Sequence, residues 1–274
     1  MRAHMILIGA VAVLTGAAPL NAQSLEQRIV RGDGTVRMSF TPRPGVCGDG
    51  GATIYTTEPG SRRRTIHVRG NTYSSTTSDP FGDEWEPHCV TGPVRVAMTI
   101  ENGAVASLRT YVGGDWPGGG SARDLGRVSA KDAARAMVRV AEKATGRAAT
   151  EILFAASLAD SADFAADLLS LARNKAMAAA TRKAAIYHLG SAAADVATRG
   201  LRDVATDADE EIAVRESAVF ALSRLPKDVG VPALIDLVRN STEPRVRRSA
   251  IFWLARTDDP RAIRLFEELL LAKK

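Results

Sequence analysis

The sequence has few of the residues on which most enzymes and metal proteins depend. Among 274 residues there are four histidines and two cysteines. They form no C-x2-C or H-x3-H pair of the kind that binds zinc. Phosphate-binding loops of the Walker type, the dinucleotide-binding glycine pattern and the G-x-S-x-G nucleophile turn are also missing. We therefore predict a protein that is not an enzyme and that carries no cofactor.

Aromatic residues and long apolar runs are scarce as well. Aromatic residues make up 5% of the chain, and the two densest basic clusters, residues 62–64 and residues 245–248, contain none. The formal net charge of +5 does not by itself indicate nucleic acid, because single-strand binders interleave basic and aromatic side chains. No segment beyond residue 22 is apolar enough to cross a bilayer. We expect neither a nucleic-acid partner nor a membrane span after signal removal.

The N-terminus is organised as a secretory signal peptide. Arg2 and His4 form a short basic start, residues 5–14 are almost wholly apolar, and small residues follow through Ala22. The apolar core is about half of the roughly 20 residues that a membrane-spanning helix needs, which favours a cleaved signal over an anchor. We predict a signal peptide over residues 1–22 and a periplasmic or secreted protein.

The two cysteines are interpreted in the light of export. In an oxidising compartment Cys47 and Cys89 are expected to form one disulfide, which would stabilise the fold by about 3–4 kcal/mol on the chain-entropy model. Two free thiols are the first alternative. A zinc site that adds His67 and His88 is the second, although the spacing does not favour it. The acidic segment 79–86 could hold a hard cation but lacks the order of a calcium loop.

From about residue 34 to residue 112 the hydrophobic pattern has a period of two. Val36, Met38 and Phe40 alternate with polar residues, and residues 94–100 repeat the pattern. The Asn102-Gly103 pair after them predicts a hairpin turn, and two weaker strands fit residues 52–57 and 65–68. We predict a small, disulfide-linked antiparallel β domain of four to five strands over residues 23–112, followed by a Gly-rich linker over residues 113–128.

At Ser129 the pattern changes to that of helices and then repeats. Ser129 is a good N-cap residue, with Asp132 three positions later. Residues 181–189, 214–222 and 246–254 align without gaps at offsets of 33 and 32 residues, and a degenerate earlier copy begins near residue 148. Leucine and valine recur at a matching phase in a second helix of each unit. A helix–turn–helix unit of this kind buries its apolar faces only by stacking on its neighbours.

The shared pattern V-R-x-x-A-[VI]-x-x-L resembles HEAT repeats of the short bacterial type, also called PBS-lyase-type HEAT repeats. The resemblance covers roughly residues 148–274, with the helix at 129–145 as a cap. It implies an armadillo-like α-solenoid of about four repeats over residues 129–274, and a role as a scaffold or adaptor. The expected fold class is α+β: a small antiparallel β domain followed by an α-solenoid.

The repeats also suggest an ion-pair ladder. Asp203 and Asp236 occupy the same place on successive second helices, and Arg215 and Arg247 occupy the same place on the first helices that follow. HEAT repeats commonly carry such ladders, so we predict the pairs Asp203–Arg215 and Asp236–Arg247. The alternative is that these charges simply face water.

Candidate binding residues lie on the first helices. One slot of the aligned segments varies between His188, Ala221 and Trp253, and Arg247 with Arg248 lies near the last of them. Tryptophan and arginine are enriched where proteins bind proteins, so His188, Arg247, Arg248 and Trp253 are predicted to contact a protein partner. Trp253 could instead cap the terminal repeat. The leading hypothesis is an exported, non-enzymatic scaffold. The alternative is a protein whose β domain binds a small ligand or a metal, with the solenoid as support.

Overall fold

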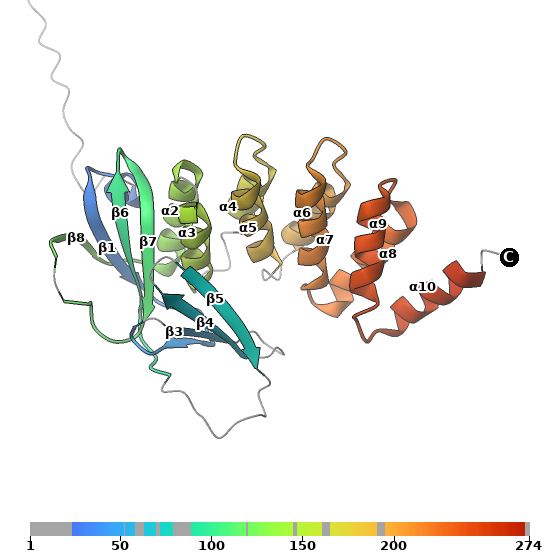
Figure 1. The fold of residues 1–274 in the computed structure, drawn as a ribbon, viewed down its shortest axis with the longest axis horizontal. Helices are drawn as coiled ribbons and strands as arrows, with labels where there is room; N and C mark the ends of the chain where they lie inside the picture. Colours follow the sequence, from blue (N-terminus) through green and yellow to red (C-terminus); the bar gives the residue numbers. More distant parts are fainter. Residues whose placement is uncertain are drawn as a thin grey trace, which may run out of the picture.

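A computed structural model describes residues 24–51, 53–57, 63–69, 72–78, 89–118, 120–144, 147–160, 165–190 and 195–271. A β region forms one end of the molecule, and a row of helices leads away from it (Figure 1). The predicted signal peptide and the acidic segment 79–86 with His88 lie outside the described residues. The predicted α+β architecture, with a helical solenoid after the sheet region, is confirmed.

The β region contains two four-stranded sheets, with strand orders β7-β6-β1-β8 and β2-β3-β4-β5. A short helix α1 precedes them, and the elements are α1 Leu25–Ile29, β1 Gly34–Phe40, β2 Val46–Gly48, β3 Thr53–Thr57, β4 Arg63–Arg69, β5 Thr72–Ser78, β6 Val94–Glu101, β7 Ala104–Val112 and β8 Ala122–Arg127. The predicted hairpin joins β6 to β7, where Asn102 and Gly103 have φ values of 53° and 73°. These positive values are what a tight hairpin turn of this type requires.

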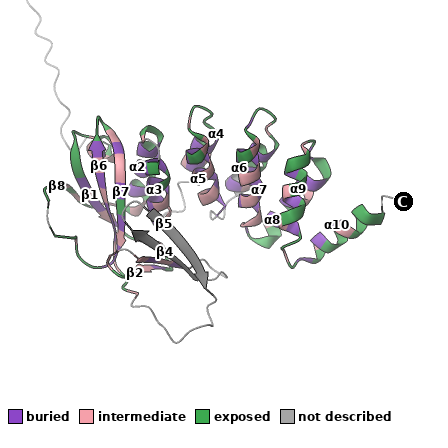
Figure 2. Ribbon diagram, in the orientation of Figure 1, coloured by how far each residue is buried: buried purple, intermediate pink, exposed green. Residues whose placement is uncertain are grey.

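The first sheet is half-buried, as the period-two pattern predicts. Val36, Met38 and Phe40 of β1 are fully buried, and their neighbours in the sequence are only partly so. The buried residues of the sheet belong to one hydrophobic cluster that continues into the helices, and β7 lies against α2 and α3. Figure 2 shows buried residues running from β1, β6 and β7 into the neighbouring helices. The first sheet therefore does not need a core of its own, because the solenoid completes it.

Two parts of the sequence-based description need correction. The described residues hold eight strands instead of four to five, and residues 122–127 of the predicted linker form β8, which pairs with β1 in parallel. The sheet is therefore mixed. At the start of the same linker, the carbonyl oxygens of Gly113 and Asp115 accept hydrogen bonds from Arg95 of β6, which also donates to that of Gly50 at 3.0 Å. A side chain that is 3% exposed thus holds the glycine-rich segment against β6.

Cys47 and Cys89 form the predicted disulfide, with their Cα atoms 5.4 Å apart. It ties β2 to the segment before β6, where the backbone of Gly48 exchanges hydrogen bonds of 3.1 and 2.8 Å with Val90. Because both sulfurs are bonded to each other, the free-thiol and Cys2His2 zinc alternatives are excluded for these two cysteines.

The helices of the solenoid form two layers. They are α2 Ala130–Lys143, α3 Arg147–Ser157, α4 Ala165–Arg173, α5 Ala179–Leu189, α6 Asp195–Thr206, α7 Ile212–Ser223, α8 Lys227–Asn240, α9 Pro244–Leu254 and α10 Pro260–Leu271. Ser129 caps α2 as predicted, since its hydroxyl accepts a hydrogen bond of 3.0 Å from the backbone of Asp132. The first layer consists of α3, α5, α7 and α9, which contact one another in sequence, and the second layer contains the helices between them.

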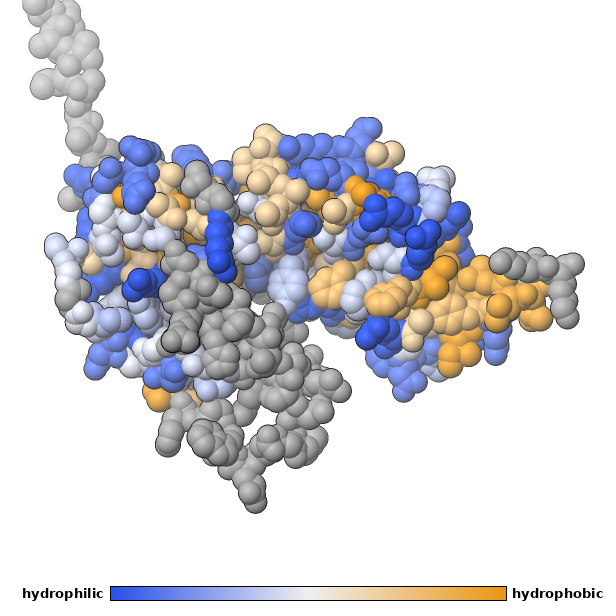
Figure 3. Space-filling view, viewed as in Figure 1, coloured by the Kyte–Doolittle hydropathy of each residue, from blue (hydrophilic) through white to orange (hydrophobic). Residues whose placement is uncertain are grey.

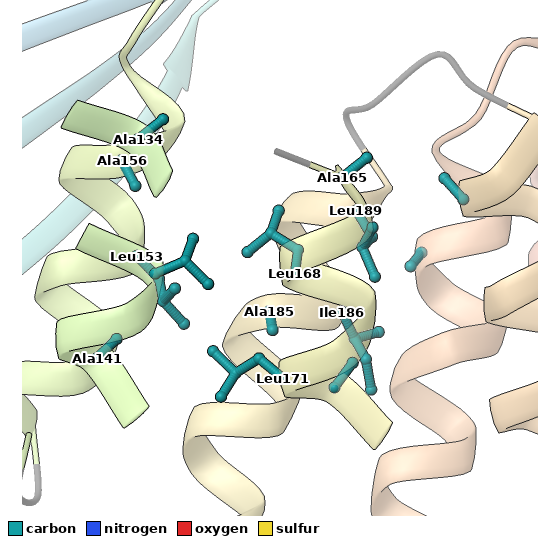
Figure 4. Packing of buried hydrophobic residues seen from close by; sticks show 14 of the residues in the cluster. Ala134, Ala141, Leu153, Ala156, Ala165, Leu168, Leu171, Ala185, Ile186 and Leu189 are labelled. Atoms are coloured by element: carbon teal, nitrogen blue, oxygen red, sulfur yellow. The ribbon is translucent and has the colours of Figure 1, made fainter. Parts of the chain in front are cut away.

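Each second-layer helix lies against the first-layer helix that follows it in the chain, so that α2 packs on α3, α4 on α5, α6 on α7 and α8 on α9. Figure 4 shows Leu153 of α3 facing Leu168 and Leu171 of α4 across the boundary between two such pairs. The recurrent alanines of the first layer, Ala185 and its two equivalents, are fully buried and allow the helices to approach closely.

Glu151 is unusual in this core because it is a buried carboxyl among apolar residues. It lies on α3 beside β7, it is 2% exposed, and burial raises the pKa of its carboxyl; Arg147 and the backbone of Leu108 only partly offset this shift. The folded state therefore holds the proton more tightly than the unfolded chain does. Stability conferred by this group is complete below the ordinary pKa of 4.5 and is lost as pH rises through the raised value.

Glu151→Gln is accordingly expected to remove the decline of stability that the parent shows between the ordinary and the raised pKa, and so to be more stable relative to the parent at neutral pH than at acid pH. Urea titrations at a series of pH values between acid and neutral measure both effects. Glu142→Gln, at an exposed position of α2, is the matched control. Parallel pH profiles for parent and Glu151→Gln would contradict the prediction.

Candidate partner-binding surface

Aromatic side chains line the first layer of the solenoid. Tyr187 of α5, Phe220 of α7 and the neighbours Phe252 and Trp253 of α9 form a row that we call the aromatic ridge. The ring centroids of Tyr187 and Phe220 are 6.2 Å apart and those of Phe220 and Trp253 are 4.8 Å apart. The rings of Phe252 and Trp253 meet edge to face at 5.0 Å. The ridge therefore links three successive repeats through ring contacts.

The repeat explains why these rings share one side of the layer. Tyr187, Phe220 and Phe252 occupy the same place in the three aligned segments, two residues before a buried leucine. Residues at equivalent places of stacked helices face the same way, so an aromatic residue at this slot in each repeat generates a row. Tyr187, Phe220 and Trp253 are partly buried, and Phe252 is 50% exposed. The row thus contributes to packing and still presents ring surface.

Arginines lie over the ridge at a repeated spacing. The guanidinium carbon of Arg224 is 4.3 Å from the ring centroid of Tyr187 and 6.0 Å from that of Phe220. Arg256 is 5.0 Å from the ring of Phe252. In both repeats the arginine follows the phenylalanine by four residues: Arg224 comes directly after the end of α7, and Arg256 comes two residues after the end of α9. The ridge therefore combines ring faces with positive charge, a pairing enriched where proteins bind other proteins.

The structure brings together some of the predicted binding residues and separates others. Trp253 lies within the ridge, and the ring of His188 is 5.2 Å from that of Tyr187. Arg248 precedes Phe252 by one turn and is exposed. Arg247 is exposed as well, but it precedes Ile251 by one turn and so faces another side of α9. Trp253 contacts the preceding repeat through Phe220, so a packing role for it is compatible with a place in the ridge.

The residues that sequence reasoning missed are Tyr187, Phe220, Phe252, Arg224 and Arg256. Their signal was present in the aligned segments, as a constant aromatic slot followed in two copies by an arginine four residues later. The variable slot beside it, which holds His188, Ala221 and Trp253, is the one that the sequence-based prediction used. Constant aromatic residues at helical spacing are usually core residues, and only the structure shows that Phe252 is half exposed.

The predicted ion-pair ladder is wrong in its partners. Asp203 accepts from Arg173, and Asp236 accepts from Arg202, so both pairs join second-layer helices to each other. A third pair, Arg239–Glu268 at 2.6 Å, continues the row from α8 to α10. All of these side chains are at least 37% exposed, so each pair contributes little to stability.

The arginines assigned to that ladder have a different role. Arg215 donates to the carbonyl oxygen of Ala205 at 3.1 Å, and Arg247 donates to that of Ser241 at 3.3 Å. These carbonyls lie at the C-terminal ends of α6 and α8, where backbone oxygens lack helical partners. Arg215 and Arg247 therefore cap the helix that precedes each of them, and Asp203 and Asp236 pair with arginines of the second layer instead.

The metal-binding alternative finds no support in the part of the chain that the structure describes. No group of three or more histidine, cysteine, aspartate or glutamate side chains there is placed to hold an ion. The side chain of His67 and the whole of His88 lie outside that part, so the site drawn from them is not tested.

The helices among the described residues are all too short or too polar to span a membrane. Comparison with known proteins gives one family match: residues 198–274 match the model of HEAT repeats. No curated protein matches the chain. The matched residues contain most of α6 and all of α7 to α10, and α3 to α5 continue the same two layers towards the sheet. Residues 198–274 are thus similar to HEAT repeats, and they form the far part of a helical solenoid that follows a mixed β region.

Proposed function

We propose that this protein is a non-enzymatic scaffold that binds another protein along the aromatic ridge of its solenoid. The observation that carries the proposal is the repeated pairing of a phenylalanine of α7 or α9 with an arginine just beyond the end of the same helix, next to Tyr187. HEAT repeats serve as surfaces for protein interaction, and stacked repeats offer an extended surface of this kind.

The chemistry of the ridge indicates what its partner carries. Ring faces attract apolar and aromatic side chains, and the guanidinium groups of Arg224 and Arg256 attract carboxylates. Ring centroids 4.8 to 6.2 Å apart offer neighbouring contact points to side chains on one face of a partner segment. The proposed partner segment therefore combines apolar side chains with acidic ones.

Export is part of the same proposal. A disulfide between Cys47 and Cys89 persists in oxidising compartments and is rare in the cytosol. It agrees with the signal-peptide layout of the first 22 residues. The protein is proposed to act in the periplasm or outside the cell, where its partner must also lie.

The experiment is a pull-down from a periplasmic extract with the processed protein as bait, followed by affinity measurement with the partner it captures. Replacing Phe252 and Arg256 together by serine is expected to weaken binding at least tenfold, because aromatic and arginine side chains at interfaces commonly contribute more than about 1.4 kcal/mol each. Phe252 is half exposed, so the variant is expected to fold.

Arg173→Ala is the matched control, since Arg173 is an exposed arginine on the second layer. It is expected to bind as the parent does. Thermal unfolding of each variant checks the fold. Capture of no partner by the parent, or equal affinity of the parent and the folded ridge variant, would overturn the proposal.

A further inference from the structure

Among the described residues, no helix covers the stacking surface at the α9–α10 end of the solenoid. Ile186, Val219 and Ile251 occupy the same place in the aligned segments of α5, α7 and α9. Ile186 and Val219 are 0% exposed, whereas Ile251 is 37% exposed. One turn before Ile186, Arg182 reaches forward to Glu210 and Glu211 at the start of the next repeat. This side of a first-layer helix therefore receives the next repeat, and on α9 it is open.

Helix α10 repeats the pattern in the second layer. At an offset of 32 residues, Val231 and Val238 of α8 correspond to Ile263 and Leu270 of α10. The two valines are 2% and 6% exposed, but Ile263 and Leu270 are 55% and 73% exposed. The earlier second-layer helices each lie against a following first-layer helix, and within the described residues no helix covers α10 in that way.

These apolar residues gather on one end of the molecule, and Figure 3 shows the hydrophobic colour concentrated over α9 and α10. Together with two charged residues beside them they form what we call the end face: Arg247, Ile251, Ile263, Glu267 and Leu270. Glu267 lies between Ile263 and Leu270 along α10, and Arg247 lies one turn before Ile251 along α9. An exposed apolar surface rimmed by charges is typical of an interaction site.

We propose that the end face binds the end face of a second copy of this chain, giving a two-fold symmetric dimer. In this dimer, α10 of each copy packs against the exposed sides of α9 and α10 of the other copy. The opposite end of the solenoid is covered by the sheet, since β7 lies on α2 and α3. Head-to-tail stacking therefore lacks a receiving surface, and a symmetric pairing of like surfaces is the arrangement that the chain offers.

Charge complementarity supports this occupant. Within the stack, the arginine of α5 is neutralised by glutamates of the repeat that covers it. Its equivalent Arg247 donates to the carbonyl oxygen of Ser241 but is still exposed, one turn before Ile251 on α9, while Glu267 lies between Ile263 and Leu270 on α10. In a two-fold pairing that sets α9 against α10 of the other copy, Arg247 of each copy faces Glu267 of the other. The surface is thus complementary to itself in charge as well as in apolar character.

The test is the mass of the processed full-length protein in solution, followed by sedimentation or by light scattering up to about 100 μM. The parent is expected to dimerise. Leu270→Glu and Ile263→Glu are expected to raise the dimer dissociation constant at least tenfold, because each buries a charge at the apolar centre. Val90→Glu is the matched control: Val90 is a 48% exposed valine of the β region, and its replacement is expected to leave the dimer unchanged.

A charge exchange separates this proposal from a general loss of solubility or fold. Arg247→Glu and Glu267→Arg are each expected to weaken the dimer, because like charges then meet twice across the two-fold axis. The double variant restores opposite charges and is expected to recover dimerisation to within about threefold of the parent. A parent that stays monomeric, a dimer insensitive to Leu270→Glu, or a double variant no better than either single one would overturn the proposal. Capture of a different protein by the end face in place of self-association would also overturn it. The dimerisation measurements do not depend on whether the aromatic ridge binds a partner.

Discussion

Arg182→Ala is expected to lower the free energy of unfolding by about 3–5 kcal/mol, the largest loss of any single substitution considered for this protein. Arg182 is a 2% exposed side chain on α5, and its guanidinium forms an ion pair with Glu210, whose side chain is 3% exposed. It also pairs with the exposed Glu211 at 3.1 Å. Removing the arginine would leave the carboxylate of Glu210 buried without its counter-charge, at the contact between two repeats.

Two further variants distinguish a buried charge from a simple loss of contact. Arg182→Met combined with Glu210→Leu removes both charges and is expected to recover most of the lost stability, because apolar residues of similar size can replace a buried pair. Arg173→Ala breaks an exposed pair with Asp203 and is expected to cost less than about 1 kcal/mol. Urea unfolding of the four proteins measures the differences. Equal losses for Arg182→Ala and Arg173→Ala would show that burial of the pair does not matter.

The parts of the fold that were predictable from sequence are those in which burial recurs at a fixed period. In β1 the alternation of Val36, Met38 and Phe40 follows directly from one buried sheet face. The repeated V-R-x-x-A-[VI]-x-x-L segments follow from stacking, since each helix must bury the same positions against its neighbours. Such patterns are written locally in the chain, and so a single sequence reveals them.

The strands that sequence reasoning missed lack such a pattern. In β8 no residue is buried, and the strand exists only through its pairing with β1, which lies far away in the sequence. The strand β5 consists mainly of serine and threonine and lacks the apolar alternation that marks a half-buried strand. Pairing with the distant β1 decides β8, whereas β5 pairs with β4, the strand directly before it in the sequence.

The partners of the ion-pair ladder were predicted wrongly, and the aromatic ridge was not predicted, for a different reason. Alignment of repeats places Asp203 and Asp236 at one slot, but it does not say which helix lies opposite that slot. The aspartates face Arg173 and Arg202 in their own layer, and Arg215 reaches backbone oxygens instead. In the same way, the constant aromatic slot was visible, but its exposure was not. The direction in which a side chain points depends on packing that one sequence does not specify.

At Gly230, helix propensity and packing have opposite effects on the stability of an alanine variant. In an exposed helix, replacing glycine by alanine would stabilise by about 1 kcal/mol. Gly230 lies inside α8, however, and a Cβ atom there would be 2.5 Å from the backbone oxygen of Leu222 in α7 and 3.3 Å from that of Leu225. Backbone atoms cannot turn aside as a side chain can, so the helix must move away from the repeat on which it packs. Gly230→Ala is therefore expected to destabilise the protein by about 2–3 kcal/mol.

Gly200→Ala is the matched control, because the three atoms nearest to a Cβ atom at this helical glycine of α6 all belong to the side chain of Leu169 and none to the backbone. That leucine can change rotamer at modest cost, about 0.5–1.5 kcal/mol, which offsets the gain in helix preference. The net change for Gly200→Ala is expected to be below about 1 kcal/mol in either direction. Thermal and urea unfolding of the two variants provide the comparison. If Gly230→Ala proves as stable as the parent, α8 is not fixed against α7 by backbone contact, and the spacing of the repeats is set by side chains instead.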